Sequence, residues 1–327
     1  MRSSSGPGIR ASIPGPGGKL DPTSVSQTVL HLTGAAPTVG VDASTLRDLL
    51  DVLVDAVQLS VRMRAEGTSR LGGSAPAWLD RAATFTVWIP PASTQVTLDA
   101  QALGDLVPEK FAQVGMSPPL DPRATCLDVF ADALDDALLS KIDSDLYDAD
   151  LVETLTRFGR VLDHGLESLE ISNGRTRILD SQSVQSLREL RRRFPADQRT
   201  RIAGWLGLLK HNSSVFSLTM SAGEVHSVIA AEVDFASLGQ LVGQQVIVLG
   251  TAKFRPSGIV QRIEADQIIS AEGDTAPWEA SPRPLFSDLD AHPLRVAQGP
   301  RSGVAAMFGQ WPGDENQADF EDAVRDL

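Results

Sequence analysis

The stretch that decides the fold lies within residues 199–272, where five short apolar segments follow one another. In chain order these segments read RIAGWLGLL (201–209), VFSLTM (215–220), VHSVIA (225–230), QQVIVLGTAKF (244–254) and GIVQRIEADQII (258–269). Turn sequences such as KHNS, SAGE and RPSG separate them, which is typical of strands. The segment FASLGQLVG (235–243) is expected to form a short helical turn before the fourth strand. The stretch therefore predicts five strands with one helix after the third.

This order of elements resembles the OB-fold, and the resemblance covers about a quarter of the chain. Gly204 and Gly207 are expected to let the first strand bend sharply enough to close a small barrel. In the second segment, Phe216 and its apolar neighbours alternate with polar residues, so one face is expected to be buried. The resemblance implies that single-stranded nucleic acid would bind across the second and third strands and the loops beside them.

On this resemblance the tentative nucleic-acid-binding residues are one aromatic ring and four basic or imidazole side chains: Trp205, Lys210, His211, Lys253 and Arg255. The set is small, because a stacked base contributes about 1–3 kcal/mol and affinity needs several such contacts. A barrel that contacts only proteins, or that has a structural role, is the alternative and stays open.

Residues 23–195 predict an α+β domain ahead of the barrel. A strand is expected near residues 25–33, and hairpins from ATFTVWI with TQVTLDA and from SLEIS-NG-RTRIL. Apolar residues at helical spacing predict four helices, near residues 44–61, 125–141, 146–166 and 181–193. The leucine register of the third helix continues to Leu169. The acidic run DSDLYDAD (143–150) is expected to be a solvated turn in which an aspartate caps the next helix.

Composition and charge exclude several classes of protein. The 327 residues contain one cysteine, which excludes a disulfide framework and indicates a reducing, cytoplasmic location. No apolar run approaches the roughly 18 residues of a membrane span, so no membrane partner is expected. The net charge of −13 is concentrated in residues 121–170 and 273–327, whereas residues 171–272 are mildly basic. A chain of this charge is not expected to be a general nucleic-acid binder.

No catalytic motif, nucleotide loop or metal-ligand spacing is present, so neither an enzyme nor a cofactor or metal site is expected. Cys126 lies on a predicted helix and is expected to be buried and inert. A hydrolase that uses the aspartate-rich helices is the least favoured hypothesis.

The two ends of the chain differ from its middle. Residues 1–22 are rich in glycine and proline, which predicts disorder. Residues 273–327 are expected to form a flexible, acidic tail that folds on a partner. Its sequence FGQWPGDENQADFED (308–322) resembles the C-terminal tails of prokaryotic antitoxins, which wrap a ribonuclease toxin. The tentative partner-binding residues are Phe308, Trp311, Phe320, Val324 and Leu327.

The sequence thus predicts a non-enzymatic protein-interaction or adaptor protein, with an antitoxin-like inhibitor as its sharpest form. Its partner would be another protein with a basic surface, because the tail is acidic. A tail that folds back on its own domains is the alternative for this segment. The alternative function for the whole chain is binding of single-stranded nucleic acid through the barrel.

Overall fold

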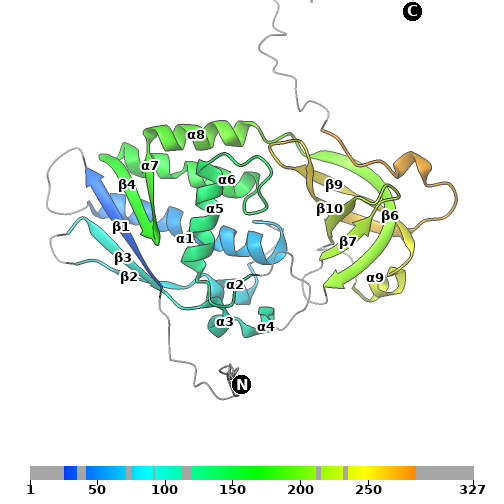
Figure 1. Ribbon diagram of the computed structural model, residues 1–327, viewed down its shortest axis with the longest axis horizontal. Helices are drawn as coiled ribbons and strands as arrows, with labels where there is room; N and C mark the ends of the chain where they lie inside the picture. Colours follow the sequence, from blue (N-terminus) through cyan, green and yellow to red (C-terminus); the bar gives the residue numbers. More distant parts are fainter. Residues whose placement is uncertain are drawn as a thin grey trace, which may run out of the picture. The chain divides into compact units, whose positions relative to one another are not determined.

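The fold is taken from a computed structural model that describes residues 26–34, 42–70, 75–90, 93–111, 120–210, 215–230 and 235–284. Within these ranges an antiparallel sheet with helices is followed by a closed five-stranded barrel (Figure 1). The predicted α+β class and the barrel in the C-terminal half are therefore confirmed.

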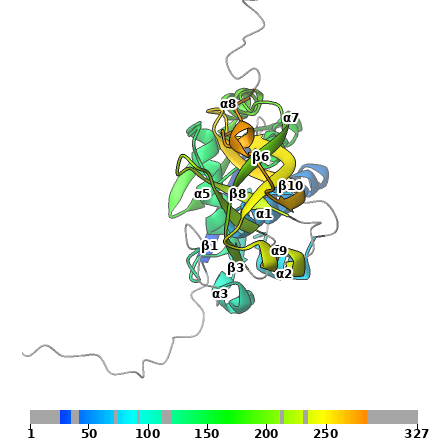
Figure 2. The same cartoon turned by 90° about the vertical axis from the view of Figure 1, so that its right-hand side faces the viewer.

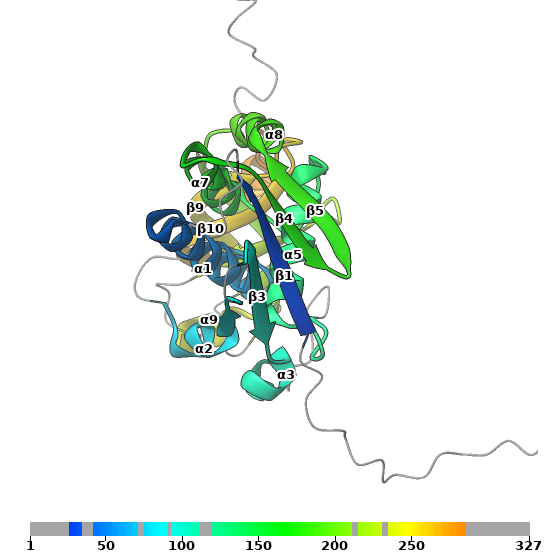
Figure 3. The same cartoon turned by 90° about the vertical axis from the view of Figure 1, so that its left-hand side faces the viewer.

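The sheet of the N-terminal part has the strand order β2-β3-β1-β4-β5. Its strands are β1 (Ser26–Gly34), β2 (Phe85–Trp88), β3 (Gln95–Ala100), β4 (Leu166–Asn173) and β5 (Arg175–Asp180). The predicted single strand lies at the centre, and each predicted hairpin supplies two strands on one side of it. Leu30, Leu98 and Ile171 are fully buried on the face that the helices cover. Figure 3 shows this sheet with the helices behind it.

The helices are α1 (Ala43–Glu66), α2 (Ala77–Ala82), α3 (Leu103–Leu106), α4 (Pro108–Phe111), α5 (Cys126–Leu138), α6 (Ala149–Thr156), α7 (Phe158–Asp163) and α8 (Ser181–Arg192). Their starts follow local capping chemistry. Thr125 and Asp128 form a capping box at the start of α5, and Asp180 accepts a hydrogen bond from the Ser183 backbone at the start of α8. None of the helices in the described ranges is long and apolar enough to cross a membrane.

The prediction of one long helix over residues 146–166 was wrong. The segment contains α6 and α7, divided at Arg157, and the chain then turns at Gly165, whose φ is +97°. Leu169, which continued the helical register in the sequence, is a buried residue of β4 paired with Leu32 and Leu179. A leucine three residues beyond Leu166 fits both a helical stripe and a strand that alternates Leu169 with Ile171, so spacing alone did not separate them.

The barrel closes in the order β10-β8-β7-β6-β9. Its elements are β6 (Gln198–Lys210), β7 (Val215–Thr219), β8 (Val225–Ile229), α9 (Phe235–Leu241), β9 (Gln245–Phe254) and β10 (Val260–Ser270). All neighbouring strands are antiparallel except β8 and β10, which are parallel. The five predicted strands and the helix are all present. This mixed, closed barrel is compatible with an OB-like fold.

Glycines permit the close approach of strands in the barrel. β6 pairs with β9 along its first part and with β7 along its second, so it bends between them. A Cβ atom at Gly207 would lie 2.3 Å from Ser217 Oγ, and one at Gly250 would lie 2.2 Å from the carbonyl oxygen of Glu264. Only a residue without a side chain fits at such positions. Phe216 points into the barrel core, as expected, and is 2% exposed.

Residues 274–281, here called the strap, lie on the barrel although the sequence placed them in a flexible tail. They contain the short 3-10 helix η1 (Ala276–Trp278), which contacts β6 and is coloured orange in Figure 2. The Trp278 ring lies 3.7 Å from the Arg201 guanidinium, and Glu279 accepts a hydrogen bond from Gln245. Ser281 hydrogen-bonds to His226 at 2.7 Å. The tail therefore begins after the strap.

Candidate functional site at the barrel and its contact with the α+β part

The structure separates the predicted nucleic-acid residues rather than gathering them. Trp205 is 51% exposed on β6 and pairs with Gln245 at the start of β9. Lys253 lies at the other end of β9, about 25 Å away along the strand at 3.3 Å per residue. The described residues therefore do not place a basic pair beside the exposed ring.

Two of the predicted nucleic-acid-binding residues, and all of the predicted partner-binding residues in the tail, lie partly or wholly outside the described residues. Lys210 is the last residue of β6, and only its backbone is described. His211 lies outside the described residues. The same holds for the predicted partner-binding residues Phe308, Trp311, Phe320, Val324 and Leu327.

Lys253 and Arg255 are engaged by carboxylates of this chain. The guanidinium of Arg255 forms an ion pair with Asp145 and donates to the carbonyl of Asp143 at 3.0 Å. The ammonium of Lys253 pairs with Asp197 and lies 3.7 Å from Glu264. A phosphate would have to displace these carboxylates, so neither side chain is a ready phosphate ligand.

The acidic turn 143–150 is solvated only in part: Asp143 and Asp145 are exposed and Asp148 caps the next helix, as predicted, but the end of the turn is buried. Tyr147 is fully buried and Asp148 is 2% exposed. Arg262 of β10, 3% exposed, donates from Nη1 to Asp148 Oδ2 at 3.1 Å. Gln261 donates to the backbone carbonyl of Tyr147 at 2.8 Å. The prediction failed for Asp148 because aspartates on a helix–helix turn are usually exposed to water. The sequence did not reveal that β10 would cover this aspartate.

Asp148 is held as a carboxylate by several donors. It caps α6 by accepting from the Leu151 backbone at 3.1 Å, and it accepts from the backbone and hydroxyl of Ser69 at 3.0 and 2.5 Å. Burial alone would raise the pKa of Asp148, but Arg262 and these hydrogen bonds together lower it below its usual value. This group fixes three segments to one another: residue 69, the start of α6 and the start of β10.

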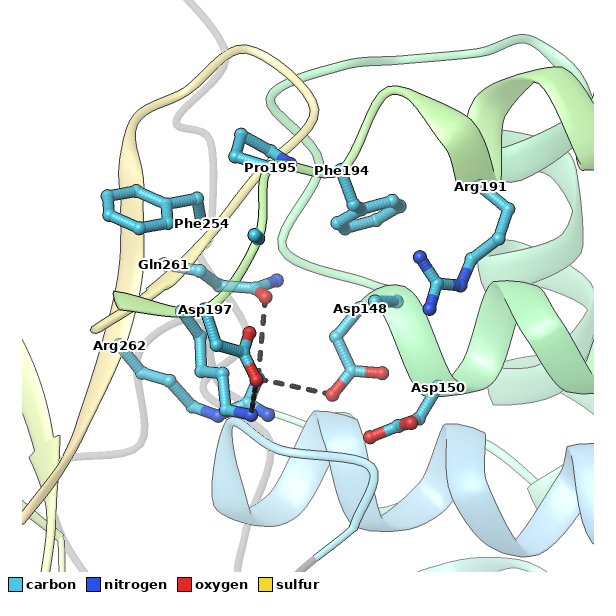
Figure 4. A pocket seen from close by; sticks show the side chains of 12 residues that line it. Asp148, Asp150, Arg191, Phe194, Pro195, Asp197, Phe254, Gln261 and Arg262 are labelled. Carbon is cyan, nitrogen blue, oxygen red and sulfur yellow. Dashed lines mark hydrogen bonds and ion pairs between the residues drawn. The ribbon is translucent and has the colours of Figure 1, made fainter. Parts of the chain in front are cut away.

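A cavity of about 340 Å³ adjoins this contact (Figure 4). Asp148 and Asp150 line it from α6, and Arg191 and Phe194 line it from the end of α8 and just beyond. Its lining from the linker and the barrel consists of Pro195, Ala196, Asp197, Lys253, Phe254, Gln261 and Arg262. The cavity thus combines buried charges with apolar rings.

A second feature is a row of three paired residues across three strands of the barrel, of which the two outer ones are exposed. Trp205 on β6 pairs directly with Thr219 on β7, and Thr219 pairs with Val225 on β8. Directly paired residues of an antiparallel ladder share one face, so the three side chains are neighbours. Val225 is 62% exposed and Trp205 is 51% exposed. We call this row the barrel face.

Carboxylates lie at the margin of the barrel face. Glu224 directly precedes Val225, and its carboxylate lies 3.7 Å from Nε2 of His226. Glu279 of the strap accepts from Gln245, the β9 partner of Trp205. Hydrogen bonds from Ser221, Thr275 and Gln245 lower the pKa of Glu279, which keeps it ionised. The face is therefore apolar at its centre and acidic at its edge. Sequence reasoning found Trp205 but missed Val225, because one valine in a strand is an ordinary core residue.

The structure also places the cysteine and the candidate metal ligands that the sequence analysis considered. Cys126 is fully buried, and burial raises the pKa of its thiol to about 12. The described histidines, cysteine and acidic residues form no group of three or more that is placed to hold a metal ion.

Comparison with known proteins adds no relative. No family model, no curated protein and no solved structure matches this chain.

Proposed function

We propose that this chain is a non-enzymatic protein-binding protein whose OB-like barrel presents the barrel face to a partner in the cytoplasm. The observation that carries the proposal is the row Trp205–Thr219–Val225, whose two apolar side chains are more than half exposed, with the carboxylates of Glu224 and Glu279 nearby. Exposed aromatic and apolar side chains with a polar margin are the usual composition of protein-binding surfaces. The acidic margin favours a partner with basic residues around an apolar centre.

The OB-like assignment of the barrel rests on its topology. The strands close in the order first, second, third, fifth, fourth, with the helix between the third and fourth and a parallel third–fifth pair. Barrels of this kind bind diverse ligands on the face of their second and third strands, which is where Val225 lies. The same architecture serves many functions, so the ligand class is argued from the side chains.

The side chains favour protein over nucleic acid. Single-strand binders of this architecture need cations that follow the phosphate backbone beside their stacking rings. Here Lys253 and Arg255 pair with carboxylates, the guanidinium of Arg201 stacks on the Trp278 ring, and the barrel face is bordered by Glu224 and Glu279. Carboxylates repel phosphates, so binding of a single strand through Trp205 stays the second candidate.

The sharper form of the proposal is an antitoxin-like inhibitor. It rests on the sequence of the tail, whose aromatic and acidic residues resemble toxin-binding tails and suit a nuclease with a basic site. The barrel face would then be a second contact with the same partner. Two linked contacts bind more tightly than either one alone, because the second forms at high effective concentration.

Affinity capture with the full chain tests the proposal. Wild type, Trp205→Ser and Ile259→Ser would be compared in a lysate of the source cells, and captured proteins would be quantified by mass spectrometry. Ile259 is a matched control because it is 55% exposed in the turn before β10, away from Trp205. We expect one protein whose capture falls by about tenfold or more with Trp205→Ser and is unchanged with Ile259→Ser. Equal capture by all three chains would contradict the barrel-face contact.

The purified chain would also be titrated with a fluorescein-labelled oligothymidylate at low and moderate salt. Affinity that falls steeply with salt and is lost in Trp205→Ser would replace the protein proposal with the nucleic-acid one. A variant ending at residue 285 separates the two contacts. Capture that survives this truncation but not Trp205→Ser places the partner on the barrel alone.

A further inference from the structure

We infer that the cavity beside Asp148 binds a small zwitterion of the amino-acid type, with Arg191 as the ligand for its carboxylate and Asp150 as the ligand for its ammonium group. This site shares no residue with the barrel face. An experiment that contradicts the ligand site therefore leaves the proposed protein contact unaffected, and the reverse also holds. Small-molecule sites are concave, lie preferentially where two parts of a fold meet, and occupy about 300–1,000 Å³. At about 340 Å³ between α6, α8 and the barrel, this cavity has the size and position of such a site.

The charged side chains at one side of the cavity are paired with one another. The side chains of Asp148 and Arg262 are each 3% exposed and pair at 3.1 Å, and Glu264 takes a second hydrogen bond from Arg262 at 3.0 Å. Lys253 is likewise neutralised by Asp197. These five groups, two cations and three carboxylates, pair with one another, so they shape the cavity and leave neither Arg262 nor Lys253 free for a ligand.

Two oppositely charged side chains that line the cavity, Arg191 and Asp150, do not pair with each other. The Arg191 guanidinium reaches only Glu153 among the described residues, through Nε at 3.3 Å, and its terminal nitrogens make no hydrogen bond there. The Asp150 carboxylate has no hydrogen-bond or ion-pair partner in the same part of the chain. Figure 4 shows the ends of both side chains turned into the cavity. A ligand with one negative and one positive group would form an ion pair with each of these two side chains.

The remaining walls suit an apolar substituent between these charges. Phe194 and Phe254 line the cavity, and Pro195 lies between them in the view of Figure 4. The two rings are 9% and 3% exposed, so they supply a small apolar part of a lining that is mostly polar. An amino acid with a large apolar side chain combines all three requirements, and L-phenylalanine is the simplest probe.

Isothermal titration of the full chain with three probes tests this inference. L-phenylalanine carries both charges, L-phenylalaninamide lacks the carboxylate and N-acetyl-L-phenylalanine lacks the ammonium group. We expect L-phenylalanine to bind at least about tenfold more tightly than either blocked compound. Each blocked compound leaves one protein charge unpaired in the cavity, which is the physical reason for the difference.

Variants then assign the two roles. Asp150→Asn should weaken L-phenylalanine by about tenfold and leave N-acetyl-L-phenylalanine unchanged, whereas Arg191→Gln should weaken L-phenylalanine and leave the amide unchanged. Arg192→Gln is the matched control, because Arg192 is an exposed neighbour on α8 that does not line the cavity. Far-ultraviolet circular dichroism checks that each variant is folded. No binding of L-phenylalanine up to about 10 mM, or equal affinity for all three probes, would overturn the inference.

Discussion

Arg262 and Asp148 show how single buried charges join the two parts of this chain. Each side chain is 3% exposed, and the donors of Ser69 and Leu151 complete the shell of the carboxylate. Removing one member of such a pair leaves the other charged and buried, which costs far more than loss of an exposed pair. The pair therefore makes a strong prediction about stability.

Arg262→Ala is expected to lower the free energy of unfolding by about 3–5 kcal/mol, because Asp148 would remain buried without its cation. Arg199→Ala is the control, since Arg199 pairs with Asp266 at 2.6 Å but both side chains are more than half exposed. That control should cost no more than about 1 kcal/mol. Urea unfolding measures both. Equal losses would show that the Arg262 pair is not buried in solution.

The same pair predicts an acid dependence. The pKa of Asp148 is lowered in the folded chain, so the folded state binds this proton less readily than the unfolded state. Its stabilising contribution is fully present above the unfolded pKa of about 3.9 and is lost as the pH falls through the lower folded pKa. Asp148→Asn should be much less stable than wild type at neutral pH, and the gap should narrow below about pH 4. A gap that is constant with pH would contradict the ionised state of Asp148.

Cys126 predicts a thiol that reacts only when the chain unfolds. It is fully buried, and its pKa of about 12 leaves almost no thiolate at pH 8. Because the chain has one cysteine, the signal of Ellman's reagent reports this residue alone. We expect no fast reaction in buffer and one equivalent in guanidinium chloride. Rapid reaction of the native chain would show that α5 is not packed as described.

At the scale of elements, the barrel depends on strands that approach closely at glycines. Gly250→Ala would place a Cβ atom 2.2 Å from the Glu264 carbonyl, which requires β9 and β10 to separate. We expect a loss of about 1–3 kcal/mol or more. Gly239→Ala in α9 meets nothing within 4 Å and should be neutral or stabilising by about 0.5–1 kcal/mol. Thermal unfolding compares them, and equal effects would contradict the strand packing.

The order of elements was predictable because alternation and turns are local. The strand segments from 201 to 269, the Asn173–Gly174 hairpin and the cap at Asp180 all follow from neighbouring residues. The break of the predicted 146–166 helix was not predictable, because its leucines fit both the spacing of a helix and the alternation of a strand. Nor was the strap, since a proline-containing acidic stretch gives no sign that Trp278 will lie on Arg201.

The candidate site was predictable only in part. Trp205 was found because it was the obvious stacking ring of the predicted barrel once Phe216 was assigned to the core, and the structure leaves it exposed. The roles of Lys253 and Arg255 depend on Asp197 and Asp145, which are distant from them in sequence, so composition could not show that their charges are paired. The Arg191–Asp150 cavity depends on the same tertiary contact.

At the scale of the whole molecule, the charge has a clear distribution. Asp145 and Asp148 of the acidic turn 143–150 pair with Arg255 and Arg262 of the barrel. Part of the positive charge of residues 171–272 is therefore neutralised by carboxylates of the same chain. Arg255, Arg262 and Lys253 of the barrel are thereby paired with carboxylates, while Glu224 and Glu279 remain at the margin of the barrel face. This distribution is the physical basis for proposing a basic protein as the partner.

Site-specific photo-crosslinking in cells tests that claim most directly. Val225 would be replaced by p-benzoylphenylalanine, and Ile178, 54% exposed on the edge strand β5, would carry the same group as the control. The barrel-face proposal predicts one prominent protein adduct from position 225 and none of that mass from position 178. The same adducts from both positions, or adducts to nucleic acid alone from position 225, would contradict it.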